Sequence, residues 1–391
     1  MSRRALRSDL ERAAPVDPAA RERSWRVVQA AYAAHEPRPR RRPWAALVAV
    51  GLAVLAGAAG VAAASAPRSD VGRLVRDVLG VGQPGADRAL VRVPGGGRLL
   101  VAAGSGAWIV SEDGARRRLG AYDGASWSPH GLFAIAWGGG ELTAVDPQGE
   151  VRWTLPREVT HARWAPGDGV RVAYLSGRSL RVVYGDGTND RRVAAAREDV
   201  APAWQPGAEN VVAYVDRRDR IALVAADSGE RLWVSEPVRE PVQLLWSADG
   251  ERLLALTPRL ISLYDARGRI VGGRDVPAGV AAEHAVWAPR GKRLAVVRTS
   301  RATGRSEVVI VDGADGLRER LLPAGPGRFG APAWSPDGRR LLLPWPDADQ
   351  WLFLRPEGGR RVSAVANIAE QFAPGAGRPA FPRAVTWCCP P

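Results

Sequence analysis

The stretch Trp334-Ser335-Pro336-Asp337-Gly338 has the pattern of a strand end followed by a tight turn. Proline fixes φ at the second position of such a turn, and glycine supplies the left-handed residue that closes a hairpin. Residues 339–343 then form an apolar run, residues 351–354 read as a third strand, and residues 361–366 follow a further turn at Glu357-Gly358-Gly359. These segments predict one unit of four antiparallel strands.

The same tryptophan-turn pattern recurs along the chain, with successive tryptophans 37 to 47 residues apart. A period near 40 residues with strand-like content is typical of β-propeller blades. The apolar second strand of each unit indicates burial on both faces, as in stacked blades. We therefore expect the tryptophans to wedge between neighbouring blades. The repeat tryptophans are Trp127, Trp164, Trp204, Trp246, Trp287 and Trp334.

The two ends of the repeat region predict how the ring closes. Residues 97–101, 108–111 and 116–119 match the second, third and fourth strands of a unit, but Arg92 stands where its tryptophan is due. The last residues, 384–389, contain Trp387 and read as a first strand with nothing after it. If this strand completes the first blade, the ring has seven four-stranded blades and no free edge. Six or eight blades stay open, because residues 90–93 could supply a strand of their own.

The Trp-Ser-Pro-Asp-Gly-Arg form at residues 334–339 resembles the TolB-like, WD-repeat-like propeller repeats of bacterial envelope proteins. The resemblance extends over residues 90–389. It implies an all-β propeller domain over residues 90–391 and a location in the cell envelope. Such propellers host many different roles, so the resemblance does not define one function.

An uncharged apolar segment precedes the propeller. Residues 44–66 lie between Pro43 and Pro67, and 23 residues are enough to cross a bilayer as a helix. Arg38, Arg40, Arg41 and Arg42 on its N-terminal side predict a cytoplasmic N-terminus and an extracytoplasmic propeller, joined by a linker over residues 67–89. The alternatives are a cleaved signal peptide, with Ala62-Ala63-Ala64 as its cleavage site, and a buried core helix. Pro67, directly after Ala64-Ser65-Ala66, argues against cleavage there.

The Arg-rich tail, residues 1–43, contains a predicted short helix. Asp17-Pro18 suits a helix start, and Trp25, Val28 and Tyr32 would share one face of a helix over residues 17–34. An apolar face on an isolated tail predicts a cytoplasmic protein partner, a second copy or the membrane surface. A frayed helix without a partner is the alternative.

The charge of the chain does not predict a nucleic-acid partner. The formal net charge is +14, from 55 Lys and Arg against 41 Asp and Glu, and Lys292 is the sole lysine. This pattern indicates compositional bias, because nucleic-acid binding requires basic residues gathered on one face. The one dense basic run, Arg38 to Arg42, lies just before the apolar segment, and in the propeller region Arg alternates with Asp and Glu.

Motifs for catalysis, metals or cofactors are not found in the sequence. The four histidines lack metal-ligand spacing, and neither a Gly-x-Ser-x-Gly elbow nor a P-loop occurs. Residues 185–190 could offer oxygen ligands to calcium, but a hairpin turn is due there and is the favoured interpretation. Cys388 and Cys389 could form a vicinal disulfide, cross-link to a partner or stay free.

From these features we expect a single-pass membrane protein whose extracytoplasmic propeller binds a protein or small ligand through its loops and channel mouth. No catalytic residue and no cofactor are predicted. The first alternative is a transmembrane signalling role, in which the propeller senses and the tail holds a regulator, as in anti-sigma factors. The second is an enzyme with a site at the channel mouth.

Overall fold

The computed structural model describes residues 89–167, 171–312, 318–357, 362–373 and 379–389. The predicted membrane segment, residues 44–66, the cytoplasmic helix and the linker up to residue 88 lie outside these residues. Within the described part of the chain, no helix combines the length and apolar character needed to span a bilayer.

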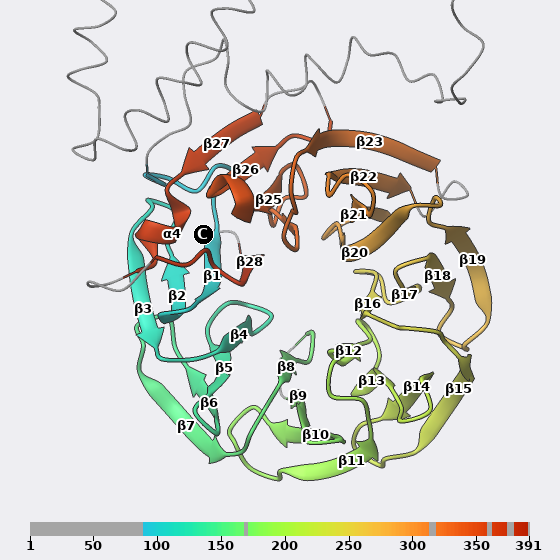
Figure 1. Cartoon of the computed structure of the whole chain (residues 1–391). Helices are drawn as coiled ribbons and strands as arrows, with labels where there is room; N and C mark the ends of the chain where they lie inside the picture. Colours follow the sequence, from blue (N-terminus) through green and yellow to red (C-terminus); the bar gives the residue numbers. More distant parts are fainter. Residues whose placement is uncertain (1–88, 168–170, 313–317, 358–361, 374–378, 390–391) are drawn as a thin grey trace, which may run out of the picture. The chain divides into compact units, whose positions relative to one another are not determined.

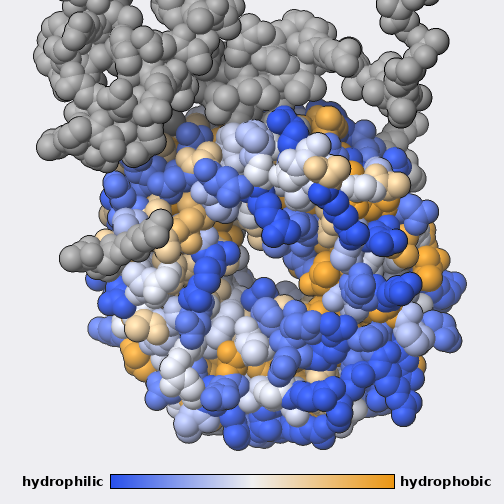
Figure 2. Space-filling view, viewed as in Figure 1, coloured by the Kyte–Doolittle hydropathy of each residue, from blue (hydrophilic) through white to orange (hydrophobic). Residues whose placement is uncertain are grey.

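Seven antiparallel sheets of four strands each surround a common centre as the blades of a propeller (Figure 1). This confirms the predicted all-β propeller and the count of seven. Figure 2 shows an opening in the middle of the ring, bordered largely by hydrophilic residues.

The blades are numbered here in chain order. Blade 1 contains β1 (Arg98–Ala103), β2 (Gly106–Val110), β3 (Arg116–Gly120) and β28 (Ala384–Cys388). Blade 2 contains β4 (Gly124–Trp127), β5 (Ala134–Gly138), β6 (Glu141–Val145) and β7 (Val151–Pro156). Blade 3 contains β8 (His161–Trp164), β9 (Arg171–Ser176), β10 (Ser179–Tyr184) and β11 (Arg191–Ala195). Blade 4 contains β12 (Ala203–Trp204), β13 (Val211–Val215), β14 (Arg220–Ala225) and β15 (Arg231–Pro237). Blade 5 contains β16 (Gln243–Trp246), β17 (Leu253–Leu256), β18 (Leu260–Tyr264) and β19 (Ile270–Asp275). Blade 6 contains β20 (Val280–Trp287), β21 (Arg293–Ser300), β22 (Ser306–Asp312) and β23 (Arg318–Gly325). Blade 7 contains β24 (Ala333–Trp334), β25 (Leu341–Trp345), β26 (Gln350–Leu354) and β27 (Val362–Ala366).

The last strand closes the ring. β28 pairs antiparallel with β1, in a register that runs from Arg98 opposite Cys388 to Ala102 opposite Ala384. Residues 90–93 form no strand, so the chain start adds no further blade. The structure thereby confirms that the C-terminal strand completes the first blade.

Burial is highest in the second strand of each blade and lowest in its outermost strand. All four residues of β17 and all five of β25 are buried, whereas residues of the outermost strand β7 are exposed or half-buried. Side chains of neighbouring blades share clusters of buried aliphatic and aromatic residues, such as the one that joins blades 6 and 7. The predicted burial of the second strands is confirmed, and it follows from the stacking of each blade between two others.

The topology gives the ring two distinct faces. In an antiparallel four-stranded blade, the link between the first and second strands and the link between the third and fourth lie at the same end. We call this end the turn face, because it carries the tryptophan turns. The opposite face carries the remaining links, including the short helices η1 (Pro346–Ala348) and α4 (Ile368–Gln371).

Candidate ligand-binding site

The six repeat tryptophans end the innermost strands of blades 2 to 7, and Trp387 lies one residue before the end of β28 in blade 1. All seven pack between neighbouring blades. Trp204 Nε1 donates to the carbonyl oxygen of Arg163, 2.9 Å away in the preceding blade. The same bond runs from Trp287 to Leu245 at 3.2 Å and from Trp334 to Val286 at 3.2 Å. Trp387 bonds within blade 1, to the carbonyl oxygen of Gly96. The hydrogen bonds of these four indoles stabilise the ring, so we assign them a structural role rather than a role in ligand binding.

Three other repeat tryptophans do not make this bond. Among the described residues, the buried indole Nε1 atoms of Trp127, Trp164 and Trp246 have no acceptor. Trp164 differs from the rest because its side chain also lines a surface pocket. Trp164 therefore combines an indole N–H that has no acceptor among the described residues with a place in the lining of this pocket.

That pocket lies on the turn face between blades 2 and 3 and has a volume of about 540 Å³. We call it the blade 2–3 pocket. One wall comes from the β4–β5 link and the other from β8, the start of β9 and the end of β10. Its lining residues are Ser128, Pro129, His130, Leu132, Phe133, Trp164, Arg171, Tyr184, Gly185 and Asp186.

Local hydrogen bonds fix both walls. In the β4–β5 link, the Phe133 amide donates to Ser128 Oγ at 3.0 Å, and the Gly131 amide donates to the Ser128 carbonyl at 2.9 Å. In the β10–β11 link, the Gly187 amide donates to the Tyr184 carbonyl at 2.9 Å. The pocket is thus formed before any ligand arrives, which lowers the entropic cost of binding.

The β10–β11 link also contains the residues 185–190 that could offer oxygen ligands to calcium. It forms the expected turn, in which Asp186 Oδ1 accepts hydrogen bonds from the amide and the hydroxyl of Thr188. Within the described residues, no group of three or more His, Cys, Asp or Glu side chains is arranged to hold a metal ion.

The rim of the pocket carries fixed charges. The Arg171 guanidinium stacks 3.8 Å from the centre of the Tyr184 ring, and its Nε donates to Asp227 Oδ1 of blade 4 at 3.1 Å. Hydrogen bonds from Thr188 lower the pKa of Asp186, so this carboxyl is ionised at neutral pH. Apolar walls with a few positioned polar groups are the usual composition of a ligand site.

Leu132 marks the mouth of the pocket, because 63% of its surface is exposed. An exposed leucine alone needs no explanation. Here it stands beside Pro129 and Phe133 on the same short link, in a pocket that Trp164 and Tyr184 line from the other side. The arrangement favours binding of an apolar or aromatic group.

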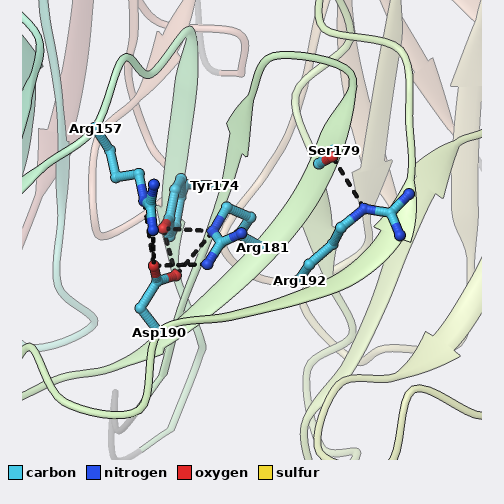
Figure 3. Close-up of polar contacts among 6 residues, drawn as sticks. All are labelled: Arg157, Tyr174, Ser179, Arg181, Asp190 and Arg192. Carbon is cyan, nitrogen blue, oxygen red and sulfur yellow. Dashed lines mark hydrogen bonds and ion pairs between the residues drawn. The ribbon is translucent and has the colours of Figure 1, made fainter.

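A second cluster of functional side chains joins blades 2 and 3 near their outer strands (Figure 3). Asp190 accepts a hydrogen bond from Tyr174 at 2.5 Å, and Arg181 Nη2 donates to its other oxygen at 2.7 Å. Arg157, which follows β7 of blade 2, lies 3.1 Å from the same carboxylate. Sequence reasoning missed this cluster, because its members come from four separate segments.

The charges of this cluster are locked rather than poised for chemistry. Burial tends to raise the pKa of Asp190, but the hydrogen bonds from Arg181 and Tyr174 outweigh it and lower the pKa below its usual value. Burial, followed by the hydrogen bond to Asp190, raises the pKa of Tyr174 to about 12. Neither group changes protonation near neutral pH, so the cluster serves as an ionic link between blades.

Blade 6 contains a similar link. Arg298 is buried, and its guanidinium lies 2.7 Å from Glu307 and 3.0 Å from Glu319. Glu319 is also 3.1 Å from Arg274 on β19 of blade 5. Buried charge is stable only when it is paired in this way.

Two histidines lie on innermost strands, which surround the centre of the ring (Figure 1). His161 begins β8, and His284 lies three residues before Trp287 on β20. Burial lowers the pKa of both imidazoles, so both are neutral at pH 7. The cytoplasmic face predicted from Trp25, Val28 and Tyr32 lies outside the described residues.

Comparison with known proteins supports the fold. No protein-family model matches the chain, and no curated protein matches it either. The chain is similar to solved propellers. Hydrazine synthase of Kuenenia stuttgartiensis aligns with a TM-score of 0.50 and 18% identity, covering 59% of this chain and 75% of that one.

Two further solved structures are described as propellers or WD40 domains. The Cps50 (Swd1) β-propeller domain of Myceliophteria thermophila gives a TM-score of 0.51 at 16% identity, over 63% of this chain and 86% of the other. The WD40 domain of Toxoplasma gondii coronin gives 0.50 at 14%, over 62% and 70%. At these identities the similarity establishes a WD-repeat-like propeller fold and no particular function.

Proposed function

We propose that this chain is a non-catalytic binding module, a propeller that holds a protein or a small ligand in the blade 2–3 pocket. The ligand would insert an apolar or aromatic group between Leu132 and Tyr184. The observation that carries the proposal is the pocket itself, with apolar walls, rigid links and a charged rim. A closed ring suits this role, because it holds loops from different blades at fixed distances.

The cellular setting is part of the same proposal. We propose that residues 44–66 anchor the chain in the cell membrane and that the propeller lies outside the cytoplasm, as in a TolB-like envelope protein. The uncharged segment and the arginines before it support this orientation. The bound protein or ligand would then be a component of the envelope.

Site-specific photo-crosslinking in intact cells tests the proposal. The full chain carries p-benzoylphenylalanine in place of Leu132, and the products are analysed by blotting and by mass spectrometry. We expect one discrete adduct, a larger protein band or a defined small-molecule mass. The matched control is the same substitution at Leu321 in blade 6, which is 58% exposed, close to the exposure of Leu132.

The control position should give no adduct. Equal products at both positions, or none at position 132, would overturn the proposal. A partner captured only by residues 1–43, and lost with Trp25→Ala, would instead favour the signalling role. The enzymatic alternative predicts turnover of a small molecule rather than a stable adduct.

A further inference from the structure

Two adjacent cysteines lie where the end of β28 in blade 1 meets the β4–β5 link of blade 2, a contact that we call the seam. Cys388 and Cys389, the only cysteines of the chain, form a disulfide. Adjacent side chains of a strand point to opposite faces, so two neighbouring sulfurs cannot normally meet. Here β28 ends at Cys388, and Cys389 adopts a left-handed φ of 55°, which brings the sulfurs together. Of the three states left open by the sequence, the structure contains the vicinal disulfide.

This disulfide is packed against blade 2. A Cβ atom built on Gly131 would collide with Cys389 Sγ and would lie 3.3 Å from Cys388 Sγ. Gly131 belongs to the β4–β5 link, so the last residues of blade 1 press on the turn of the next blade. Only glycine fits this position, because it lacks a side chain and itself has a φ of 62°.

Arg98 completes the seam. It stands opposite Cys388 in the β1–β28 pairing, and its Nη2 donates to the Gly131 carbonyl at 2.8 Å. Its guanidinium also lies 5.2 Å from the centre of the Trp127 ring. A fixed positive charge beside a disulfide favours the thiolate that leaves when the bond is broken, and so assists exchange.

We propose that Cys388–Cys389 is a thiol–disulfide exchange site that accepts a dithiol reductant and whose oxidation state sets the order of the seam. A thiolate of the reductant attacks one sulfur, the S–S bond breaks, and its electron pair passes to the other sulfur, which takes a proton. The second thiol of the reductant then displaces the remaining cysteine. Two electrons reduce the cysteine pair, and the reductant becomes a disulfide.

The two states differ in how they constrain the backbone. While the bond is intact, Cys389 keeps its left-handed conformation and its contact with Gly131. Once the bond is broken, the two side chains rotate independently, and Cys389 can relax to an ordinary φ. The β28 end and the β4–β5 link then lose a shared contact. Both cysteines are half-buried, so a reductant can reach them.

The test uses the purified full chain, oxidised and then treated with dithiothreitol or a thioredoxin-type protein. Maleimide labelling followed by mass measurement counts the thiols. Hydrogen exchange is followed in residues 384–389 and 128–133, with residues 253–256 of blade 5 as the internal control. We expect two thiols, at least fivefold faster exchange in the two seam peptides, an unchanged control peptide, and recovery after reoxidation.

The double variant Cys388→Ser, Cys389→Ser should exchange fast at the seam with or without reductant. The proposal is overturned if two thiols appear without any change in seam exchange. It is equally overturned if thiols form only in denaturant, because the native site would then not react. Neither outcome depends on the ligand of the blade 2–3 pocket.

Discussion

Trp204 and Arg163 belong to neighbouring blades, and the indole N–H of Trp204 donates to the Arg163 carbonyl at 2.9 Å. This bond satisfies a polar atom that the wedged indole would otherwise bury without a partner. Trp287 and Trp334 repeat it, whereas Trp127 is half-buried and has no acceptor among the described residues. The repeat tryptophans therefore differ in their interblade hydrogen bonding, and the loss of unfolding free energy should depend on which tryptophan is replaced.

The first prediction compares two tryptophans. Trp334→Phe removes a hydrogen bond and part of a buried ring, so we expect the free energy of unfolding to fall by roughly 2–3 kcal/mol. Trp127→Phe removes an indole that lacks the bond and should cost about 1 kcal/mol or less. Urea unfolding of both variants measures the difference. Equal losses would show that the interblade bond contributes nothing.

The second prediction concerns Gln243, whose side-chain amide pairs with both backbone groups of Ala285, as a neighbouring strand would. Gln243 of blade 5 donates to the Ala285 carbonyl at 3.1 Å and accepts from the Ala285 amide at 2.9 Å. Gln243→Leu leaves both backbone groups of blade 6 unpaired, which should cost about 2–3 kcal/mol in unfolding free energy. Gln205→Leu, which loses one bond to the Gly250 carbonyl, is the control and should cost about half as much. A neutral Gln243→Leu would contradict the bridge.

The third prediction is a pH dependence. The pKa of Asp190 is lower in the folded chain than its ordinary value of 3.8, so folding favours the ionised form. Its contribution to stability is complete above that value and is lost as the pH falls through the lower, folded pKa. Asp190→Asn should cost about 2 kcal/mol at pH 7, because the half-buried guanidinium of Arg181 loses its counter-charge.

The cost of Asp190→Asn should begin to shrink as the pH falls below 3.8, because the unfolded carboxyl then takes up a proton, and it should disappear once the pH falls below the lower pKa of the folded carboxyl. Unfolding free energies of both proteins at pH 7, 5 and 3 measure this change. Tyr174→Phe removes two hydrogen bonds, one donated to Asp190 and one accepted from Arg181, but no charge, so its cost should change less with pH than the cost of Asp190→Asn. A difference between Asp190→Asn and wild type that stays constant down to pH 3 would refute the ionic link.

The fold was predictable because one local signal, the tryptophan turn, recurs with a nearly constant period. Each turn sets the register of one hairpin, and the unmatched strand around Trp387 predicts its own partner in the first blade. Strand boundaries moved by one or two residues: the apolar run at residues 339–343 became Leu341–Trp345. Such shifts arise because pairing with the neighbouring strand, rather than composition, decides where a strand begins.

The blade 2–3 pocket was not predictable in the same way. Its walls come from links of two repeats, and only the angle between neighbouring blades brings Leu132 near Tyr184. The ionic cluster of Asp190, Arg181 and Arg157 has the same origin. Each of these residues reads as an ordinary surface charge along the chain, and long-range packing alone gives it a partner.

The vicinal cysteines fall between these cases. Sequence alone places them at the end of a strand, where alternation keeps their sulfurs apart. The left-handed backbone at Cys389 reverses that expectation, and no residue type in the segment signals it. Its effect becomes clear only from the contact with Gly131, more than two hundred residues away in the chain.

The most direct test of the closed ring is the thermal unfolding of the full chain without residues 384–391. Losing β28 exposes an edge of β1 and removes the partner strand of the first blade. We predict a melting temperature at least roughly 10 °C lower, since each kcal/mol is worth about 2–4 °C in a domain of this kind. Deletion of residues 390–391 alone serves as the control and should leave the melting temperature unchanged. A chain lacking β28 that melts with the full chain would contradict closure by the C-terminal strand.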